Sequence, residues 1–220
     1  MKVSVNNSLL VYKGEYSPET VQRLISENRL SGLEVCSLLR DERLSSLEFL
    51  SSMTFLKELR VVSNYPYNLD VLANLNSLRS LNLNIRGFDG IRGLEDFELE
   101  SLNLSLRRNK VELKLPSTLE NMYMDEVQSS NLKFLSGGSS LRSLRIKSSQ
   151  LKSLRGIENF MNLEYLYLGG VSGLKELGRE LPNSIKKIEL ESLSSLKTID
   201  LSHVNHDVVL NVSNCPMLSR

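Results

Sequence analysis

The sequence predicts an α/β solenoid: a curved array of short repeats with a parallel β-sheet on its concave side and 3₁₀ turns, short helices or extended segments on its convex side. A phrase of leucine, two residues, leucine, one residue and leucine recurs along nearly the whole chain of 220 residues. Successive copies begin 20 to 26 residues apart, and each of the last three steps is 22 residues. A strand that returns to the same side at every step has to pair in parallel with the strand before it.

Four copies keep the phrase in full, namely Leu78-Arg-Ser-Leu81-Asn-Leu83, Leu99-Glu-Ser-Leu102-Asn-Leu104, Leu141-Arg-Ser-Leu144-Arg-Ile146 and Leu163-Glu-Tyr-Leu166-Tyr-Leu168. Looser copies begin at Leu30, Leu56, Leu119 and Ile185, and a degenerate copy keeps only Leu210 and Val212. In each copy the apolar residues alternate with other, mostly polar, residues, which predicts a short strand with one buried face. We therefore expect eight or nine parallel strands in one curved sheet.

This phrase, at a period near 22 residues, resembles the leucine-rich repeat family, and the resemblance covers residues 17–218. The family usually has an asparagine eight residues after the first leucine, where its side chain hydrogen-bonds the backbone of the turn. In this chain only one repeat has an asparagine at that position, namely Asn64. We therefore expect irregular turns and uneven curvature, with stacked apolar side chains supplying most of the burial.

The segments between the strands have two kinds of apolar pattern. Apolar residues lie three apart in one kind, as in Leu151, Leu154, Ile157, Phe160 and Leu163, or in Phe88, Ile91, Leu94 and Phe97. This spacing favours 3₁₀ turns or a short helix, and it resembles the 22-residue class of phosphatase regulators and internalin-like bacterial proteins. The other kind contains Leu115-Pro116 or Leu181-Pro182, which resembles bacterial-effector repeats with extended convex arms.

Residues 1–29 are expected to form an N-terminal helical cap, and residues 30–218 the array, the two together making one structural domain. An edge strand or hairpin is expected from the spacing of Val3, Val5, Leu9 and Val11. Ser17 followed by Pro18 is a favourable helix start, which predicts a helix from Pro18 to about Asn28. A cover is needed because a bare terminal repeat would expose a leucine-rich end.

Net charge, cysteine positions and the lack of apolar targeting segments limit the kinds of partner and location that the sequence favours. The net charge is +1, so no overall field favours nucleic acid or an anionic membrane, and the densest basic run, residues 107–110, is expected to be a solvated turn. Cys36 and Cys215 lie at opposite ends of the array, too far apart for a disulfide. The first twelve residues lack a signal-peptide pattern and no window is apolar enough to span a membrane. A cytoplasmic location is therefore expected.

The side chains that could carry chemistry are few and scattered. Asp200, His203, His206 and Asp207 form the only cluster that resembles a metal or acid–base site. Two histidines without a completing ligand pair do not make a zinc site, and we expect polar residues of a loop. Cys36 would need a histidine base, but both histidines lie at the far end of the array. We therefore expect no enzyme activity, no cofactor and no metal.

The outward-facing strand positions are the more informative surface, since strand alternation points them away from the core. The middle repeats have asparagine and serine there, whereas repeats five to eight have three tyrosines among charged residues. Tyrosine and arginine dominate binding hot spots, although tyrosine is also tolerated on any β-surface. Expecting the tyrosines to be exposed, we predict a partner-binding patch made of Tyr123, Asp125, Arg145, Lys147, Tyr165, Tyr167, Lys187 and Glu189.

A small array of this kind favours a non-enzymatic protein-binding module, monomeric when free. The resemblance implies a bacterial immunity or antitoxin protein that binds and neutralises a toxin protein, because ribonuclease-inhibitor relatives of this fold enwrap a toxic enzyme. This is an inference from fold analogy. The alternatives are a regulatory scaffold or adaptor, either phosphatase-regulator-like or a ubiquitin-ligase substrate receptor, and the recognition domain of a bacterial effector.

Overall fold

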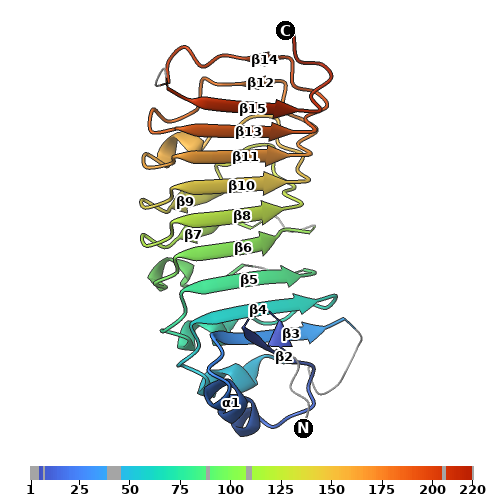
Figure 1. Ribbon diagram of the computed structural model, residues 1–220, viewed down its shortest axis with the longest axis vertical. Coiled ribbons are helices and arrows are strands. Elements are labelled where there is room, and N and C mark those ends of the chain that lie inside the picture. Colours follow the sequence, from blue (N-terminus) through green and yellow to red (C-terminus); the bar gives the residue numbers. More distant parts are fainter. Residues whose placement is uncertain are drawn as a thin grey trace.

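The computed structural model describes residues 5–6, 8–38, 46–87, 90–107, 111–204 and 207–219. Its strands stack along one long axis, with the connecting arms behind them and helix α1 at the N-terminal end (Figure 1). Val3 and Phe88, which entered the sequence predictions, lie outside the described residues. The repeating phrase therefore folds as the solenoid that its period predicts.

Within the described residues the main sheet has 11 strands, in the order β1-β2-β3-β4-β5-β6-β8-β10-β11-β13-β15. Their bounds are Val5–Asn6 (β1), Leu9–Tyr12 (β2), Gly32–Ser37 (β3), Glu58–Ser63 (β4), Ser80–Ile85 (β5), Ser101–Ser105 (β6), Asn121–Asp125 (β8), Ser143–Lys147 (β10), Tyr165–Gly169 (β11), Lys187–Glu191 (β13) and Val209–Ser213 (β15). Strand β1 pairs antiparallel with β2, and β2 pairs in parallel with β3. The sheet therefore contains the predicted eight or nine parallel repeat strands, with β2 as a further parallel strand from the N-terminal cap.

The core is a set of apolar columns in which each side chain packs on its copy in the next repeat. The middle leucine of the phrase makes one column, whose members pair in register and are all buried: Leu59, Leu81, Leu102, Met122, Leu144, Leu166 and Ile188. Because successive side chains of a strand point to opposite faces, the residues between the buried ones point to the concave surface.

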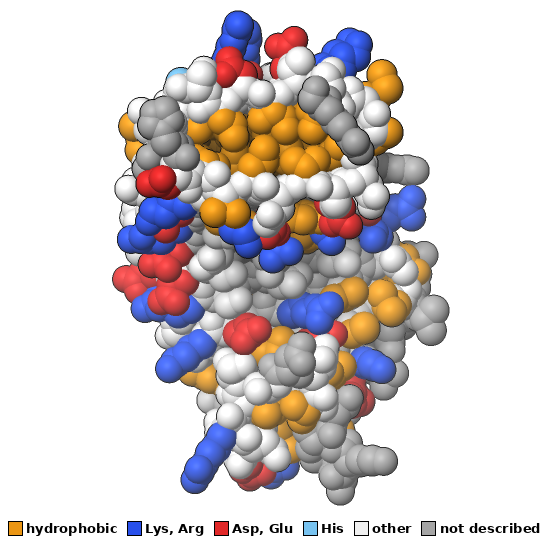
Figure 2. Space-filling model, turned by 45° about the horizontal axis from the view of Figure 1, so that its top comes forward, with side chains coloured by type: hydrophobic (Ala, Val, Ile, Leu, Met, Phe, Trp, Pro, Cys, Tyr) orange, Lys and Arg blue, Asp and Glu red, His pale blue; other side chains and the backbone are white. Residues whose placement is uncertain are grey.

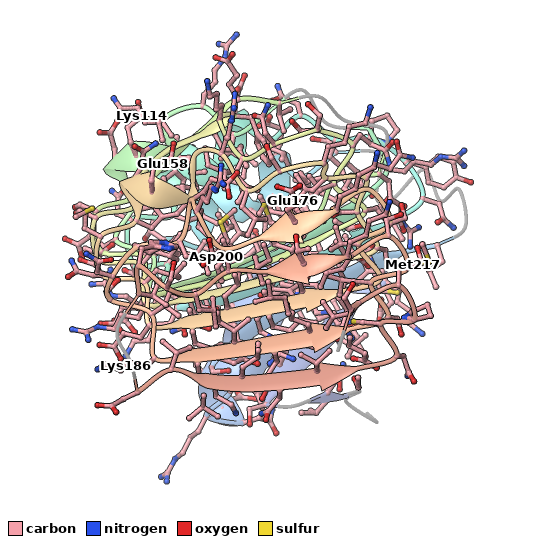
Figure 3. The ribbon with its side chains drawn as sticks, turned by 90° about the horizontal axis from the view of Figure 1, so that it is seen from above. Lys114, Glu158, Glu176, Lys186, Asp200 and Met217 are labelled. Atoms are coloured by element: carbon pink, nitrogen blue, oxygen red, sulfur yellow. The ribbon has the colours of Figure 1, made fainter. Side chains whose placement is uncertain are left out.

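Both predicted kinds of convex arm are present. The arms with apolar residues three apart contain the 3₁₀ helices η4 (Leu94–Asp96) and η5 (Ile157–Asn159), and η2 (Glu48–Ser52) and η3 (Asp70–Asn74) cover the earlier repeats. Extended arms pair as β7 (Leu113–Leu115) with β9 (Leu135–Gly137), and β12 (Glu176–Leu177) with β14 (Thr198–Ile199). Figure 3 looks down the array and shows Glu176 and Asp200 on this layer, across the core from the main sheet.

The turns that follow β8, β10, β11 and β13 are regular, so the expectation of irregular turns is wrong there. Glu126, Ser148, Gly170 and Ser192 all have positive φ, between 46° and 63°. Each donates its N–H to the carbonyl that ends the next strand, at 2.8 to 3.2 Å. The residue after each one is buried and stacks on its copies: Val127, Ser149, Val171 and Leu193. A backbone ladder therefore replaces the missing asparagine side chains.

The N-terminal end of the array is covered. Helix α1 (Pro18–Glu27) begins where Ser17 accepts a hydrogen bond from the Thr20 N–H at 3.4 Å, and it buries Val21, Leu24 and Ile25. Strand β1 pairs antiparallel with β2 and is the last strand of the sheet at this end. The helix therefore shields the first repeat from water, and a short strand forms the sheet edge.

The other end of the array is not covered by any described residue. All five residues of β15 are exposed, whereas Ile188 and Leu190 of the neighbouring strand β13 are buried. Figure 2, which brings this end forward, shows a broad apolar surface there. No helix among the described residues is long and apolar enough to cross a membrane.

The apolar column yields a stability prediction. Leu144 is fully buried at its centre, so Leu144→Ala should lower the free energy of unfolding by about 3 kcal/mol. Leu144→Asp should unfold at least the neighbouring repeats, because it buries an unpaired charge. Chemical denaturation followed by circular dichroism measures both. Lys152→Asp, at an exposed position of the next arm, should leave the transition unchanged. A folded Leu144→Asp variant with an unaltered midpoint would contradict this register.

Candidate functional site

The candidate site is the concave face of the sheet, where three rows of outward side chains cross the strands. The middle row runs Glu34, Arg60, Asn82, Asn103, Tyr123, Arg145, Tyr167, Glu189 and Asn211. The rows on either side follow the same register, so all eight residues predicted to bind a partner lie on four adjacent strands, β8, β10, β11 and β13. Neighbouring strands are about 4.8 Å apart, which makes this one contiguous area.

Two tyrosines of β11 are hydrogen-bonded diagonally to glutamates of β13. The Tyr165 hydroxyl donates to Glu189 Oε2 at 2.6 Å, and the Tyr167 hydroxyl donates to Glu191 Oε2 at 2.5 Å. Lys187 Nζ lies 2.6 Å from the other oxygen of Glu189. These charge-assisted bonds hold the side chains of two repeats in one geometry.

Three cations lie over the same two rings. The Arg145 guanidinium is 5.0 Å from the centre of the Tyr167 ring, and Lys147 Nζ is 5.6 Å from it. Lys187 Nζ is 5.6 Å from the centre of the Tyr165 ring. Among the described residues, Arg145 forms no ion pair, so its exposed guanidinium keeps its donors for a ligand.

Tyr167 is buried rather than exposed, which corrects the expectation of three exposed tyrosines. Only 7% of Tyr167 is accessible, because its ring lies over Gly169 and beneath the two cations. A Cβ added to Gly169 would approach the Tyr167 hydroxyl to 2.5 Å and the ring carbons to 2.9 Å. Tyr123 and Tyr165 are half-buried. Tyr167 is therefore the centre of the patch, and Arg145 and Tyr165 form more of its accessible surface.

The surroundings change the acidity of the groups in the patch. Burial, followed by the hydrogen bonds to Glu189 and Glu191, raises the pKa of Tyr165 and of Tyr167 to about 12. Burial and the nearby Asp125 carboxylate also raise the pKa of Tyr123. The hydrogen bonds from Lys187 and then Tyr165 lower the pKa of Glu189 below its ordinary value. At neutral pH the patch is therefore a fixed array of phenols, carboxylates and cations.

A polar hollow overlaps the N-terminal side of the patch and shares Tyr123, Asp125 and Arg145 with it. It was not predicted from the sequence, because no role was assigned there to the asparagines and the serine that complete its lining. The hollow has a volume of 430 Å³ over β4 to β10, and its polar lining residues are Arg60, Asn82, Asn84, Asn103, Ser105, Tyr123, Asp125 and Arg145. Ser105 is only 8% exposed, and neither its hydroxyl nor Arg60 Nε has a hydrogen-bond partner among the described residues. Glu34 accepts from Asn6 at 2.7 Å and from Arg60 at 3.4 Å.

The residues considered for catalysis lie away from this face or apart from each other. Asp200 accepts bonds from the backbone and hydroxyl of Ser202, which lower its pKa, and His203 Nε2 lies 3.3 Å from the Leu181 carbonyl oxygen. No group of three possible metal ligands occurs among the described residues. His206 and residues 108–110 of the basic run lie outside them. Both cysteines are free thiols.

One segment of the chain matches a known family model. Residues 139–219 match the family model for the LRR domain of the endo-beta-N-acetylglucosaminidase EndoS. This segment contains β10, β11, β13 and β15, and with them most of the predicted patch. No curated protein matches the chain. The match supports the repeat assignment made from the leucine phrase.

The contact between Tyr167 and Gly169 gives a testable prediction. Gly169→Ala should displace the Tyr167 ring, because the added methyl group would occupy the place of the ring carbons. The displaced phenol would lose its hydrogen bond to Glu191, so its pKa should fall from about 12 toward 10. A ring-carbon NMR titration measures this value, and chemical nitration of Tyr167 should become faster. Ser101→Ala on β6 is the control; an unmoved Tyr167 resonance in Gly169→Ala would contradict the packing described.

Proposed function

Because residues 139–219 match a leucine-rich repeat domain and all the repeats stack in one parallel sheet, we propose that the chain is a non-enzymatic protein-binding module whose partner docks on the C-terminal half of the concave face. The observation that carries this proposal is the ordered patch on β8, β10, β11 and β13, in which tyrosines are fixed by glutamates and cations. Side chains already held in place lose little conformational entropy on docking. Tyrosine and arginine are also the residues that most often dominate interface energetics.

The electrostatics of the patch favour recognition over proton transfer. With pKa values of about 12, Tyr165 and Tyr167 remain protonated at neutral pH and act as hydrogen-bonding groups. The uncharged tyrosines of β11 lie between the cations of β10 and the mixed charges of β13, which suits a partner of complementary mixed charge. Such a surface selects its partner through the placement of charges around a buried aromatic centre.

We propose that the partner is a toxin protein, which makes the chain an immunity or antitoxin protein of the cytoplasm. The support is the analogy with fold relatives that enwrap a toxic enzyme, together with two free thiols, which suit a reducing compartment. Affinity capture from the native host followed by mass spectrometry tests this assignment. Recovery of a phosphatase or a ubiquitin-ligase subunit would favour the scaffold or adaptor alternative.

The binding prediction compares two parts of one face. Arg145→Ala and Tyr167→Ala should each weaken partner binding by about 2 kcal/mol or more, the usual scale for hot spots. Tyr167→Ala removes the surface on which Arg145 and Lys147 rest. Asn82→Ala and Asn103→Ala, three or four strands away from Tyr167, should cost much less. Calorimetric titration with the captured partner measures all four.

Two further results sharpen that comparison. Tyr167→Phe keeps the ring and loses only the bond to Glu191, so it should bind more tightly than Tyr167→Ala. If the partner is a toxin, Arg145→Ala should also lose protection in cells while its thermal unfolding stays unchanged. Equal losses in the Asn82 and Arg145 variants would place the interface over the polar hollow or elsewhere.

The absence of catalysis is a separate prediction. Alanine at His203, His206 or Cys36 should leave biological activity within a few-fold of wild type, because none is assigned a chemical step. Removal of a true general base or nucleophile would cost about 100-fold or more. Protection assays with each single variant, alongside a thermal melt, distinguish the two cases. A large loss at unchanged stability in any one of them would point to an enzyme or metal site.

A further inference from the structure

The exposed strand β15 continues the apolar columns of the core without a neighbour to cover them. Leu210 pairs in register with Ile188, and Val212 with Leu190, yet Leu210 is 37% and Val212 is 41% exposed. Val209 and Met217 are exposed as well, and Figure 2 shows a broad apolar surface at this end of the array. Contiguous apolar surface left exposed on a folded protein marks a site of association.

The backbone of β15 offers a second set of unused groups. Val209 donates its N–H to the Lys186 carbonyl at 2.9 Å, and the Ser213 carbonyl accepts from Ser192 at 3.0 Å. Residues 209, 211 and 213 therefore direct their backbone groups toward β13. By alternation, the N–H and C=O groups of Leu210 and Val212 point to the open edge, where no described residue pairs with them.

We propose that β15 pairs antiparallel with β15 of a second copy of this chain, about a two-fold axis through Asn211. This register places Leu210 opposite Val212 of the second copy. Those two residues carry the outward-pointing groups, so each such pair exchanges both of its backbone hydrogen bonds, and the dimer has four. Opposed residues share a face of the sheet, so Leu210 and Val212 bury each other while joining the two cores.

Several observations favour a second copy over another occupant. Strand β15 reads Val-Leu-Asn-Val-Ser and has none of the charges, prolines or bulges that keep edge strands apart. In the antiparallel register Val209 lies opposite Ser213, Leu210 opposite Val212 and Asn211 opposite Asn211 of the second copy. None of these residues is charged, so no like charges meet at the junction.

The covered N-terminal end explains why pairing would stop at two copies. Helix α1 buries apolar side chains at that end, and the edge strand β1 has only two described residues, so that end does not present a second long apolar strand like β15. Self-pairing of one surface about a two-fold axis gives a closed assembly, whereas end-to-tail stacking would give a fibre. This inference replaces the expectation that the free chain is a monomer.

Sedimentation velocity of the whole 220-residue chain over a dilution series tests the proposal. Wild type should sediment with twice the mass of the chain and dissociate on dilution. The double variant Leu210→Lys, Val212→Lys should have the single-chain mass, because each lysine faces a lysine of the other copy. Met161→Lys is the matched control, since it also replaces an exposed apolar residue, 71% accessible on a convex arm, and should stay dimeric.

Amide hydrogen exchange on wild type provides a readout that does not depend on the folding of the double variant. The amides of Leu210 and Val212 should become more protected as concentration rises, and those of exposed arm residues should not. A monomeric wild type at every concentration overturns the proposal and leaves β15 for a different protein. A folded double variant that remains dimeric also overturns it, because the interface then lies elsewhere.

Discussion

The constraint on which the rest of the structure depends is that no repeat can bury its own apolar face. Leu144 is buried because Met122 and Leu166 stand on either side of it in the same column. Burial of such columns is the main favourable term in folding, and it sets the register of every strand pair. Once the columns are aligned, the residues between them have to form straight rows on the concave face. The alignment of the buried columns therefore also determines how the side chains of the candidate site are arranged.

The turns show how a backbone arrangement can take over a side-chain role. The family asparagine is missing from the later repeats, and Val127, Ser149, Val171 and Leu193 occupy its position as buried residues. The bonds it would have made are replaced by the preceding residues, whose left-handed conformation aims each N–H at the next strand. Left-handed backbone is costly for residues other than glycine, yet Glu126, Ser148 and Ser192 adopt it. Stacking of the buried residues that follow offsets that cost.

The parts of the structure that could be predicted are those set by local periodicity. The spacing of leucines determined the columns and the three rows, because one alternation rule fixes both faces of a strand. The burial of Tyr167 could not be predicted from this periodicity. It depends on the space left by Gly169 on the same face of the strand, and on the Glu191 carboxylate from the next repeat. A tyrosine two residues before a glycine in a strand is the signal that could have revealed it. The polar hollow depends on how curvature gathers Arg60, Ser105 and Arg145, which no single repeat encodes.

The diagonal bonds from Tyr165 to Glu189 and from Tyr167 to Glu191 have a consequence for how such an array can change. Each bond joins a side chain of one repeat to a side chain of the next, so neither repeat carries the arrangement alone. Repeats are otherwise interchangeable units that can be duplicated, deleted or shuffled at little cost to the fold. Recombination that separated β11 from β13 would preserve the solenoid and scatter the concave pattern. These two repeats therefore have to be inherited, or transplanted into another scaffold, as a single block.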